Sequence, residues 1–225
     1  MNALNHLPLH DREVAAELLG ELIAEQAGLA ISAGREPTVA VSSRIAVSDL
    51  GAALEKAFDA WEGLRQRVHL FSSDLCISAP CDRREEMRSL QSRLRLHARQ
   101  LHLPAEGGDV HRTARAFEAE IRSHFRLPAG EAPTFDTLCL APADLGAPRH
   151  ADASDRLATG VYNVVTGQSA VSLSVASLVG SRAVASYGPD GDARGKPRLP
   201  NSLVSRALRL HWLGGRPRGA FHAAE

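Results

Sequence analysis

The feature that most constrains the fold is a recurring pattern in which an apolar, β-branched run stops at small polar residues. It occurs at residues 38–44 (TVAVSSR), 68–74 (VHLFSSD) and 135–144 (FDTLCLAPAD). Runs of this length and composition are typical of buried strands, and the polar residues that follow are typical of loops. Three such strands, separated by longer segments, predict a parallel sheet. In open α/β sheets the carboxyl edge, where these loops would lie, is the edge that binds ligands.

Segments with apolar residues at helical spacing lie before and between these runs. They are a helix from Asp11 to about Gly28, a helix capped by Ser48, a charged helix over residues 84–101 and a helix over residues 113–125. Short strands follow at residues 161–166, 170–175, 183–187 and 208–213, with helical turns at 174–180 and 201–207. This alternation predicts one α/β domain over residues 1–225, a doubly wound, mostly parallel sheet flanked by helices. Residues 1–10 and 216–225 are expected to be loose tails.

Composition limits the functions open to such a domain. The 26 basic residues balance the 26 acidic ones, so no global field recruits nucleic acid or an anionic membrane surface. No run of 18 or more apolar residues is present, and the N-terminus lacks the features of a signal peptide. The cysteines, Cys76, Cys81 and Cys139, lack a metal-ligand spacing, and their odd number suits a reducing compartment. We therefore expect a cytoplasmic protein that binds no nucleic acid, membrane or metal. Its expected state is a monomer or weak homodimer.

The polar ends of the three runs are the candidate site. Ser42, Asp74 and Asp144 share the same context, so we expect them at the carboxyl ends of neighbouring parallel strands. His150 is the nearest histidine to the third run and could serve as a general base, with an exposed loop histidine as the alternative. No P-loop, H-E-x-x-H or G-x-S-x-G motif is present to suggest other chemistry.

The other histidines of the central segments are expected to have no role in the site and to lie either in the core or at the surface. His69 lies within the second apolar run, so it is expected to pack in the core or on a face of the sheet. His97, His102 and His124 lie on expected helices and are predicted to be at the surface.

The order of these segments resembles that of 6-phosphogluconolactonases, which share a fold with glucosamine-6-phosphate isomerases. The similarity extends from about Arg12 to Gly215 and rests mainly on TVAVSSRIAVSDLGAAL, VHLFSSDLCISAP, FDTLCLAPADLGAPRH and LPNSLVSRALRLHWLGG. The framework matches the family, whereas the functional motifs differ. The two glycines of the family's first loop fall on Ser43 and Arg44, and the histidine of its D-G-H motif falls on Ala147.

The resemblance implies hydrolysis of 6-phosphoglucono-1,5-lactone to 6-phosphogluconate, a step of the pentose phosphate pathway, without a cofactor. The substrate phosphate would then be bound by Ser42, Ser43, Arg44 and Arg149. Hydroxyls and a guanidinium can replace glycine amides as anion donors close to a helix N-terminus. A polar loop at a helix start is the alternative interpretation of residues 42–44.

The catalytic candidates under this resemblance are Asp74, Asp144 and His150. His150 would accept a proton from water, and Asp74 would orient the base or contact a sugar hydroxyl. Capping of a loop is the alternative role of Asp74. Because the motif histidine is replaced by Ala147, the alternative function is a catalytically degenerate relative that binds a sugar phosphate or a protein partner.

Overall fold

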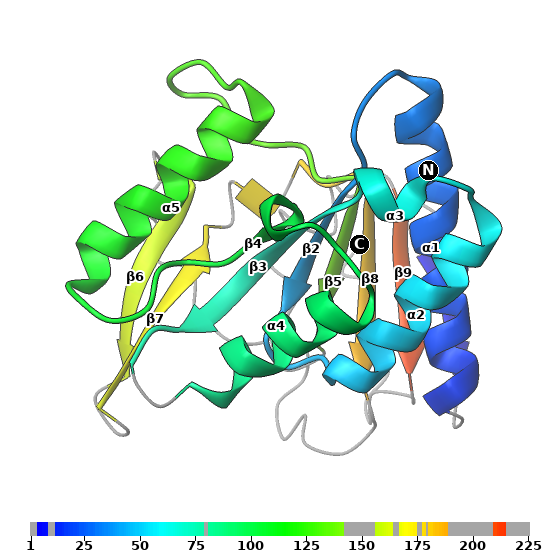
Figure 1. Ribbon diagram of the computed structural model, residues 1–225, viewed down its shortest axis with the longest axis horizontal. Coiled ribbons are helices and arrows are strands. Elements are labelled where there is room, and N and C mark those ends of the chain that lie inside the picture. Colours follow the sequence, from blue (N-terminus) through cyan, green and yellow to red (C-terminus); the bar gives the residue numbers. More distant parts are fainter. Residues whose placement is uncertain are drawn as a thin grey trace, which may run out of the picture.

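The computed structural model describes residues 4–8, 12–78, 81–141, 156–163, 167–174, 177–178, 180–188 and 209–214 (Figure 1). The helices are α1 (Arg12–Ser32), α2 (Val47–Ala60), α3 (Leu64–Arg67), α4 (Asp82–Arg93) and α5 (Val110–Phe125), with a 3₁₀ helix at Ala98–Gln100. The strands are β1 (Leu4–Pro8), β2 (Thr38–Ser42), β3 (His69–Cys76), β4 (Leu101–His102), β5 (Thr137–Leu140), β6 (Ala158–Asn163), β7 (Gln168–Leu173), β8 (Ala183–Gly188) and β9 (Arg209–Gly214).

The described strands form one mixed sheet in the order β1-β9-β8-β5-β2-β3-β7-β6, with β4 paired to β3. Neighbours from β1 to β3 are parallel, and only the pairs β3–β7 and β7–β6 are antiparallel among the described residues. The chain places β3 on one side of β2 and β5 on the other. The strand order therefore reverses at β2, and the loops after β2 and β5 diverge there, as at the ligand-binding crevice of doubly wound sheets.

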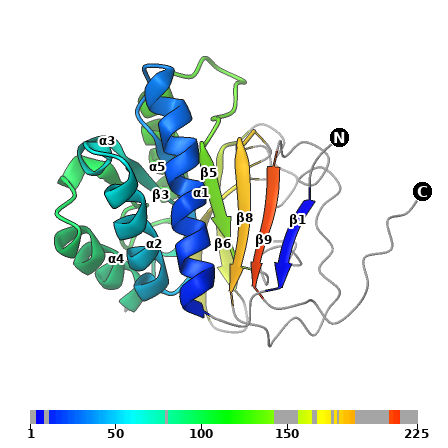
Figure 2. The same cartoon turned by 90° about the vertical axis from the view of Figure 1, so that its right-hand side faces the viewer.

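Helices cover both faces of this sheet. Helices α1 to α4 pack on one face, and α5 packs on the other (Figures 1 and 2). Consecutive residues of β3 show the division, because Leu70 belongs to the core under α1 to α4 and Phe71 to the core under α5. Both side chains are almost completely buried. This alternation is what a strand buried on both faces requires, and it confirms the α/β class predicted from the apolar runs.

The first two helices differ from the sequence expectations. Helix α1 continues past Gly28 to Ser32, and the chain turns at Gly34, whose φ is 70°. A Cβ on Gly28 would lie 2.4 Å from Cζ2 of Trp61, so this glycine permits close packing of α1 and does not end the helix. Helix α2 begins at Val47 after Ala46, without a side-chain cap, so the expected cap by Ser48 is wrong.

The long charged helix is also shorter than expected. Helix α4 ends at Arg93, and Arg95 adopts a left-handed φ of 55°. After the 3₁₀ helix, Leu101 and His102 pair with β3 as the short strand β4. Residues 84–101, expected to form one helix, therefore contain the end of α4, the 3₁₀ helix and the start of the short strand β4.

The second half of the chain contains the expected strands, with boundaries shifted by a few residues. The first ten residues are not wholly a loose tail, because Leu4–Pro8 forms β1 and pairs in parallel with β9 (Figure 2). The expected turn at 174–180 is present in part, since Leu178 N donates to Ser174 O. The expected turn at 201–207 and the expected tail at 216–225 lie outside the described residues. No helix in the described ranges has the length and apolar character needed to cross a membrane.

Candidate functional site

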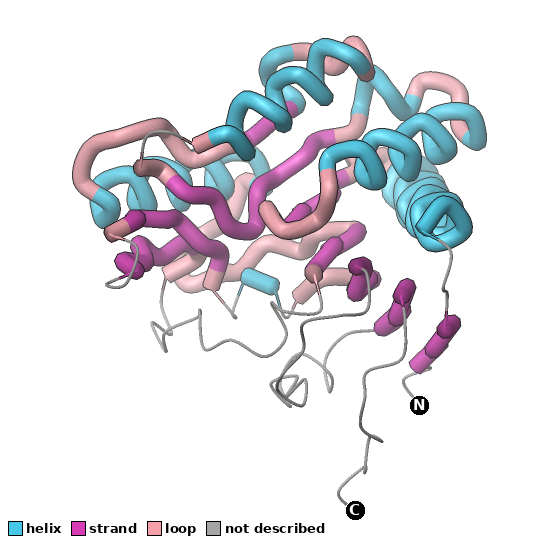
Figure 3. The backbone as a smooth tube through the Cα atoms, turned by 90° about the horizontal axis from the view of Figure 1, so that it is seen from below, coloured by secondary structure: helices cyan, strands magenta, loops and turns pink. Residues whose placement is uncertain are grey.

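The carboxyl edge of the sheet brings together two of the three residues expected there. Ser42 is the last residue of β2, and its register partner in β3 is Asp74. The register shifts between Val41 and Ser42, because Val41 pairs with Ser72 and leaves Ser73 as an extra residue on β3. Such irregularities re-aim side chains next to sites. The arrowheads of β2 and β3 point to this edge in Figure 1, and Figure 3 views the sheet from it.

Asp74 holds the loop that follows β2. Its Oδ1 accepts from Ser43 N at 3.0 Å and from Ser73 Oγ at 3.1 Å, and its Oδ2 accepts from Ser43 Oγ at 2.7 Å. The Asp74 residue is buried. Asp74 therefore caps the loop of the neighbouring strand, which is close to the structural alternative considered from the sequence. It lies inside β3, which continues to Cys76 because Asp74–Cys76 pairs with β7.

The amides of this loop already have partners within the protein. Ser43 N donates to Asp74, Arg44 N donates to Ser42 Oγ at 3.2 Å, and Ile45 N donates to Ser42 O at 3.2 Å. A glycine-rich anion loop instead directs such N–H groups at its ligand. Here the loop offers a ligand its side chains instead, and Arg44 is an exposed residue of the loop.

A second arginine at this loop was missed in the sequence. The Arg83 side chain from the first turn of α4 donates to Ile45 O and, at 3.4 Å, to Ser42 O. Arg83 thus joins α4 to the loop, and its guanidinium also forms an ion pair with Glu86 at 3.2 Å. Its position at the start of a charged helix gave no signal of this contact, which joins residues about 40 positions apart.

A cleft of about 190 Å³ opens beside Asp74, over one face of the paired strands β3, β7 and β6. Seven residues line it: Ser43, Asp74, Cys76, Val161, Gln168, Ala170 and Ser172. The lining combines hydroxyl, amide and carboxylate groups with the apolar side chains of Val161 and Ala170, so it offers hydrogen-bond partners and apolar contacts to a sugar ring. Among these lining residues none is a histidine, so the described part of the cleft supplies no imidazole base.

The other expected site residues, Asp144, Arg149 and His150, lie outside the described residues. The structure does describe strand β5, which precedes them in the chain. β5 pairs in parallel with β2, with Cys139 opposite Val41, so the chain leaves β5 at the same edge as Ser42.

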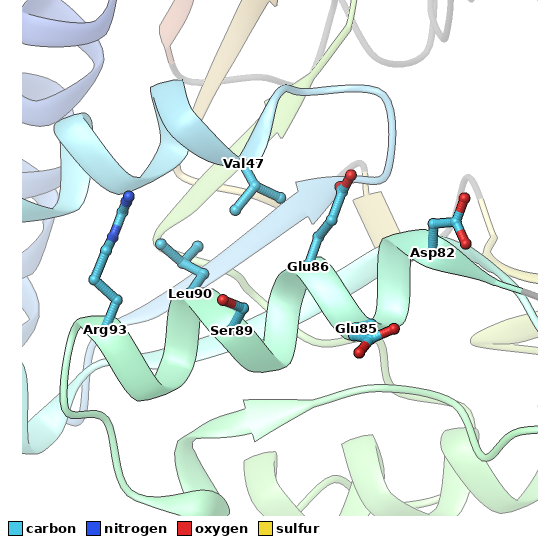
Figure 4. Close-up of a pocket in the computed structure, with 7 residues that line it drawn as sticks. All are labelled: Val47, Asp82, Glu85, Glu86, Ser89, Leu90 and Arg93. Carbon is cyan, nitrogen blue, oxygen red and sulfur yellow. The ribbon is translucent and has the colours of Figure 1, made fainter.

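A larger hollow of about 450 Å³ lies between the start of α2 and α4 (Figure 4). Its lining includes the carboxylates of Asp82, Glu85 and Glu86, with Arg93 at the far end. Acidic side chains in the first turn of a helix are stabilised by the helix dipole, and they disfavour a phosphate. This hollow therefore suits the candidate substrate less well than the carboxyl edge does.

A histidine cluster lies on the α5 side of the sheet, at the opposite end of β3. The ring of His69 lies 5.2 Å from that of His102 and 4.4 Å from that of His124, measured between centroids. His69 packs on the sheet face as expected. The expectation of surface helical positions is wrong for His102, which is buried in β4, and for His124, which is half-buried on α5.

We expect the free energy of unfolding to fall as the pH is lowered from about 6.5 to about 4. Burial lowers the pKa of His124 from 6.5 to about 4, and burial with the charge of His102 lowers the pKa of His69. The unfolded chain therefore binds protons at a higher pH than the folded chain, and stability present above pH 6.5 is lost on acidification. Because His124 is only half-buried, we expect its contribution to be roughly 1–3 kcal/mol.

Urea unfolding at a series of pH values, in buffer containing EDTA, measures this loss. His124→Phe should flatten the profile, and His111→Phe at an exposed position of α5 should leave it unchanged. A wild-type stability that stays constant over this pH range would contradict the expectation.

Comparison with models of known protein families found no match, and comparison with curated proteins found none either. Solved structures match nearly the whole chain. 6-Phosphogluconolactonase from Trypanosoma brucei has a TM-score of 0.72 at 14% identity, with 95% of this chain and 97% of that one covered. The enzyme from Thermotoga maritima has a TM-score of 0.70 at 16% identity, with 95% and 100% covered. A monomeric glucosamine-6-phosphate deaminase has a TM-score of 0.68 at 10% identity, with 94% and 97% covered. The chain therefore has the fold that 6-phosphogluconolactonases share with glucosamine-6-phosphate deaminases.

Proposed function

We propose that this protein is a 6-phosphogluconolactonase-like hydrolase, converting 6-phosphoglucono-1,5-lactone and water to 6-phosphogluconate. The observation that carries the proposal is the Ser42–Arg44 loop, which lies beside Asp74 at the carboxyl edge of a sheet of this fold. Helix α2 begins three residues after Arg44, so its N-terminus adds positive potential near a phosphate bound there. The odd cysteine count supports a cytoplasmic location.

In this proposal the substrate phosphate binds Arg44 and the hydroxyl of Ser43, with Arg149 as a further cation. Water attacks the lactone carbonyl carbon while His150 accepts its proton. The tetrahedral intermediate then collapses, the bond from the carbonyl carbon to the ring oxygen breaks, and that oxygen takes the proton to become a hydroxyl. Asp74 acts as a positioning residue, since its carboxylate fixes Ser43 through two hydrogen bonds.

A second candidate function, sugar-phosphate binding without hydrolysis, is favoured by the contacts within the same loop. Asp74 is engaged by three donors, and the loop amides donate within the protein. A coupled assay for 6-phosphogluconate, corrected for spontaneous lactone opening, distinguishes the two. A rate above the spontaneous one supports the hydrolase, whereas tight binding of 6-phosphogluconate without such a rate supports the binding protein.

We expect Arg44→Ala to weaken the binding of 6-phosphogluconate by roughly 1.5–3 kcal/mol, the usual value of a hydrogen bond to a charged group. Arg44 would carry more of the phosphate affinity than in a glycine-rich loop, because the surrounding amides donate to Asp74 and Ser42. For that reason wild-type affinity should also be lower than in a relative with the glycine-rich loop. Isothermal titration calorimetry of both proteins measures the difference.

Arg115→Ala is a matched control, since Arg115 is an exposed arginine on α5, which covers the other face of the sheet. It should bind like the wild type. Equal affinity in Arg44→Ala and the wild type would show that the phosphate does not bind at this loop.

A further inference from the structure

Three histidines from three separate elements meet at the end of β3 that lies away from Asp74. His69 is the first residue of β3, His102 is the last residue of β4, and His124 lies in the last turn of α5. One ring nitrogen from each lies within 4.8 Å of those of the other two. His69 Nδ1 and His102 Nε2 are 2.9 Å apart. Two ligands of one tetrahedral zinc ion are about 3.3 Å apart, so this pair already has nearly the required spacing.

The outer nitrogens of the two sheet histidines contact carboxylates. His69 Nε2 is 3.1 Å from Glu36 Oε2, and His102 Nδ1 is 2.6 Å from Glu120 Oε1. An ionised carboxylate only accepts hydrogen bonds, so a ring whose outer nitrogen donates to its carboxylate has no hydrogen on the inner nitrogen. With both rings in that form, the two inner nitrogens direct lone pairs at each other across 2.9 Å, as two ligands of one metal ion do.

We propose that His69, His102 and His124 bind a divalent transition-metal ion, with Glu36 and Glu120 orienting the two sheet histidines. A donor set of three imidazoles suits Zn²⁺, whereas Mg²⁺ and Ca²⁺ prefer oxygen ligands. A carboxylate bonded to the outer nitrogen of a ligating histidine is the usual support of such ligands. The three nitrogens lie within 4.8 Å of one another, so His124, which is only half-buried, has to move closer to the other two to complete the three-nitrogen set. A catalytic or open zinc site of this kind takes water as its fourth ligand.

The surroundings of the cluster fit this role. The Phe71 ring stacks on His102 with centroids 4.1 Å apart and an angle of 5°, which fixes the imidazole plane. The Glu36 and Glu120 side chains are 58% and 44% exposed, so solvent and ions can reach the outer side of the cluster. A bound metal would tie the end of α5 to β3 and β4 and add its binding free energy to the stability of the fold. Asp74 lies about 16 Å farther along β3, so the site is separate from the proposed lactonase site.

The test is the zinc affinity of the EDTA-stripped full chain, measured in competition with a chromophoric chelator. We expect one Zn²⁺ per chain, without competition from Mg²⁺. Glu120→Gln should weaken binding about 10–100-fold, the usual effect of removing a supporting carboxylate. His124→Ala removes a ligand and should weaken it by more than about 100-fold. His111→Ala, at an exposed position of the same helix, should leave the affinity unchanged.

X-ray absorption of the zinc-loaded wild type gives an answer that does not depend on how the variants fold. Nitrogen ligands at about 2.0–2.1 Å support the proposal, and sulfur at about 2.3 Å overturns it by moving the ion to a cysteine such as Cys76 or Cys81. Equal zinc affinity in His124→Ala and the wild type also overturns it. So does the absence of stoichiometric binding, which would make the His69–His102 contact a hydrogen bond between two neutral rings.

Discussion

Replacing His150 with alanine should lower the rate of lactone hydrolysis by roughly 10²–10⁴-fold, the usual contribution of a positioned general base. The residue at the family's histidine position is Ala147, which cannot accept a proton. Hydrolysis by this protein must therefore use another group, and His150 is the nearest histidine in sequence to that position. The chain reaches it from β5, whose carboxyl end lies beside that of β2.

The pH dependence separates a base from a binding residue. The wild-type rate should rise with pH across the range in which an ordinary imidazole loses its proton, about pH 6–7. His150→Ala should lose this rise and keep its affinity for 6-phosphogluconate. The spontaneous opening of the lactone also accelerates with pH, so it is measured without enzyme at each pH and subtracted. His111→Ala serves as the control for loss of a histidine elsewhere.

Two outcomes would contradict this assignment. Activity that persists undiminished in His150→Ala would place the base on another residue. A wild-type rate equal to the spontaneous one, together with retained binding of 6-phosphogluconate, would favour the non-hydrolytic function.

The apolar runs predicted the parallel centre of the sheet because burial on both faces leaves a clear pattern in a strand. The same pattern misplaced the end of β3. Ser72, Ser73 and Asp74 are polar, so the sequence predicts a loop after Phe71, yet the strand continues to Cys76. Its continuation depends on pairing with β7, nearly 100 residues later, and no local pattern encodes such a partner.

A glycine in helix α1 also shows that a local pattern cannot reveal a distant packing partner. Gly28 follows a regular amphipathic segment and was expected to end it, but its missing side chain makes room for the Trp61 ring of another element. The strand β1 was missed for a related reason. Leu4–Pro8 has no strong strand pattern and pairs with β9, about 200 residues away.

The sequence predicted which strand ends lie together at the candidate site, but not the hydrogen bonds that its residues form. The shared strand-then-polar context placed Ser42 and Asp74 at one edge, and the structure pairs them. The sequence could not show that Asp74 would direct both carboxylate oxygens at Ser43. The histidine cluster was missed altogether, because its members are 33 and 22 residues apart and have no motif spacing. Only the packing of α5 over β3 and β4 brings them together.

The largest effect on stability is expected from a residue with no catalytic role, Asp136. Its carboxylate is almost completely buried where β2, β5 and β8 begin. Oδ2 accepts from Thr38 N and Thr38 Oγ1, each at 3.0 Å, and Oδ1 lies 2.9 Å from Arg35 Nη1 and 3.4 Å from Arg182 Nε. One side chain thus joins three parallel strands at the amino edge.

Asp136→Ala should lower the free energy of unfolding by about 2–4 kcal/mol. The change leaves the buried Thr38 N–H without its acceptor and two arginines without their counter-charge. The cost falls below that of a fully buried pair because the Arg35 and Arg182 side chains are 37% and 43% exposed, so water can solvate them. Urea unfolding followed by circular dichroism measures the change as a lower midpoint at an unchanged slope.

Glu55→Ala provides the contrast for this prediction. Glu55 forms an ion pair with Arg93 at 3.9 Å, with both side chains more than half exposed. Exposed pairs contribute at most about 1 kcal/mol, so this variant should unfold close to the wild-type midpoint. If Asp136→Ala were as mild as Glu55→Ala, burial and the hydrogen bond to Thr38 N would not be the source of the stability. A large loss confined to Asp136→Ala would locate this stability in the buried contacts of Asp136 at the start of β2, β5 and β8.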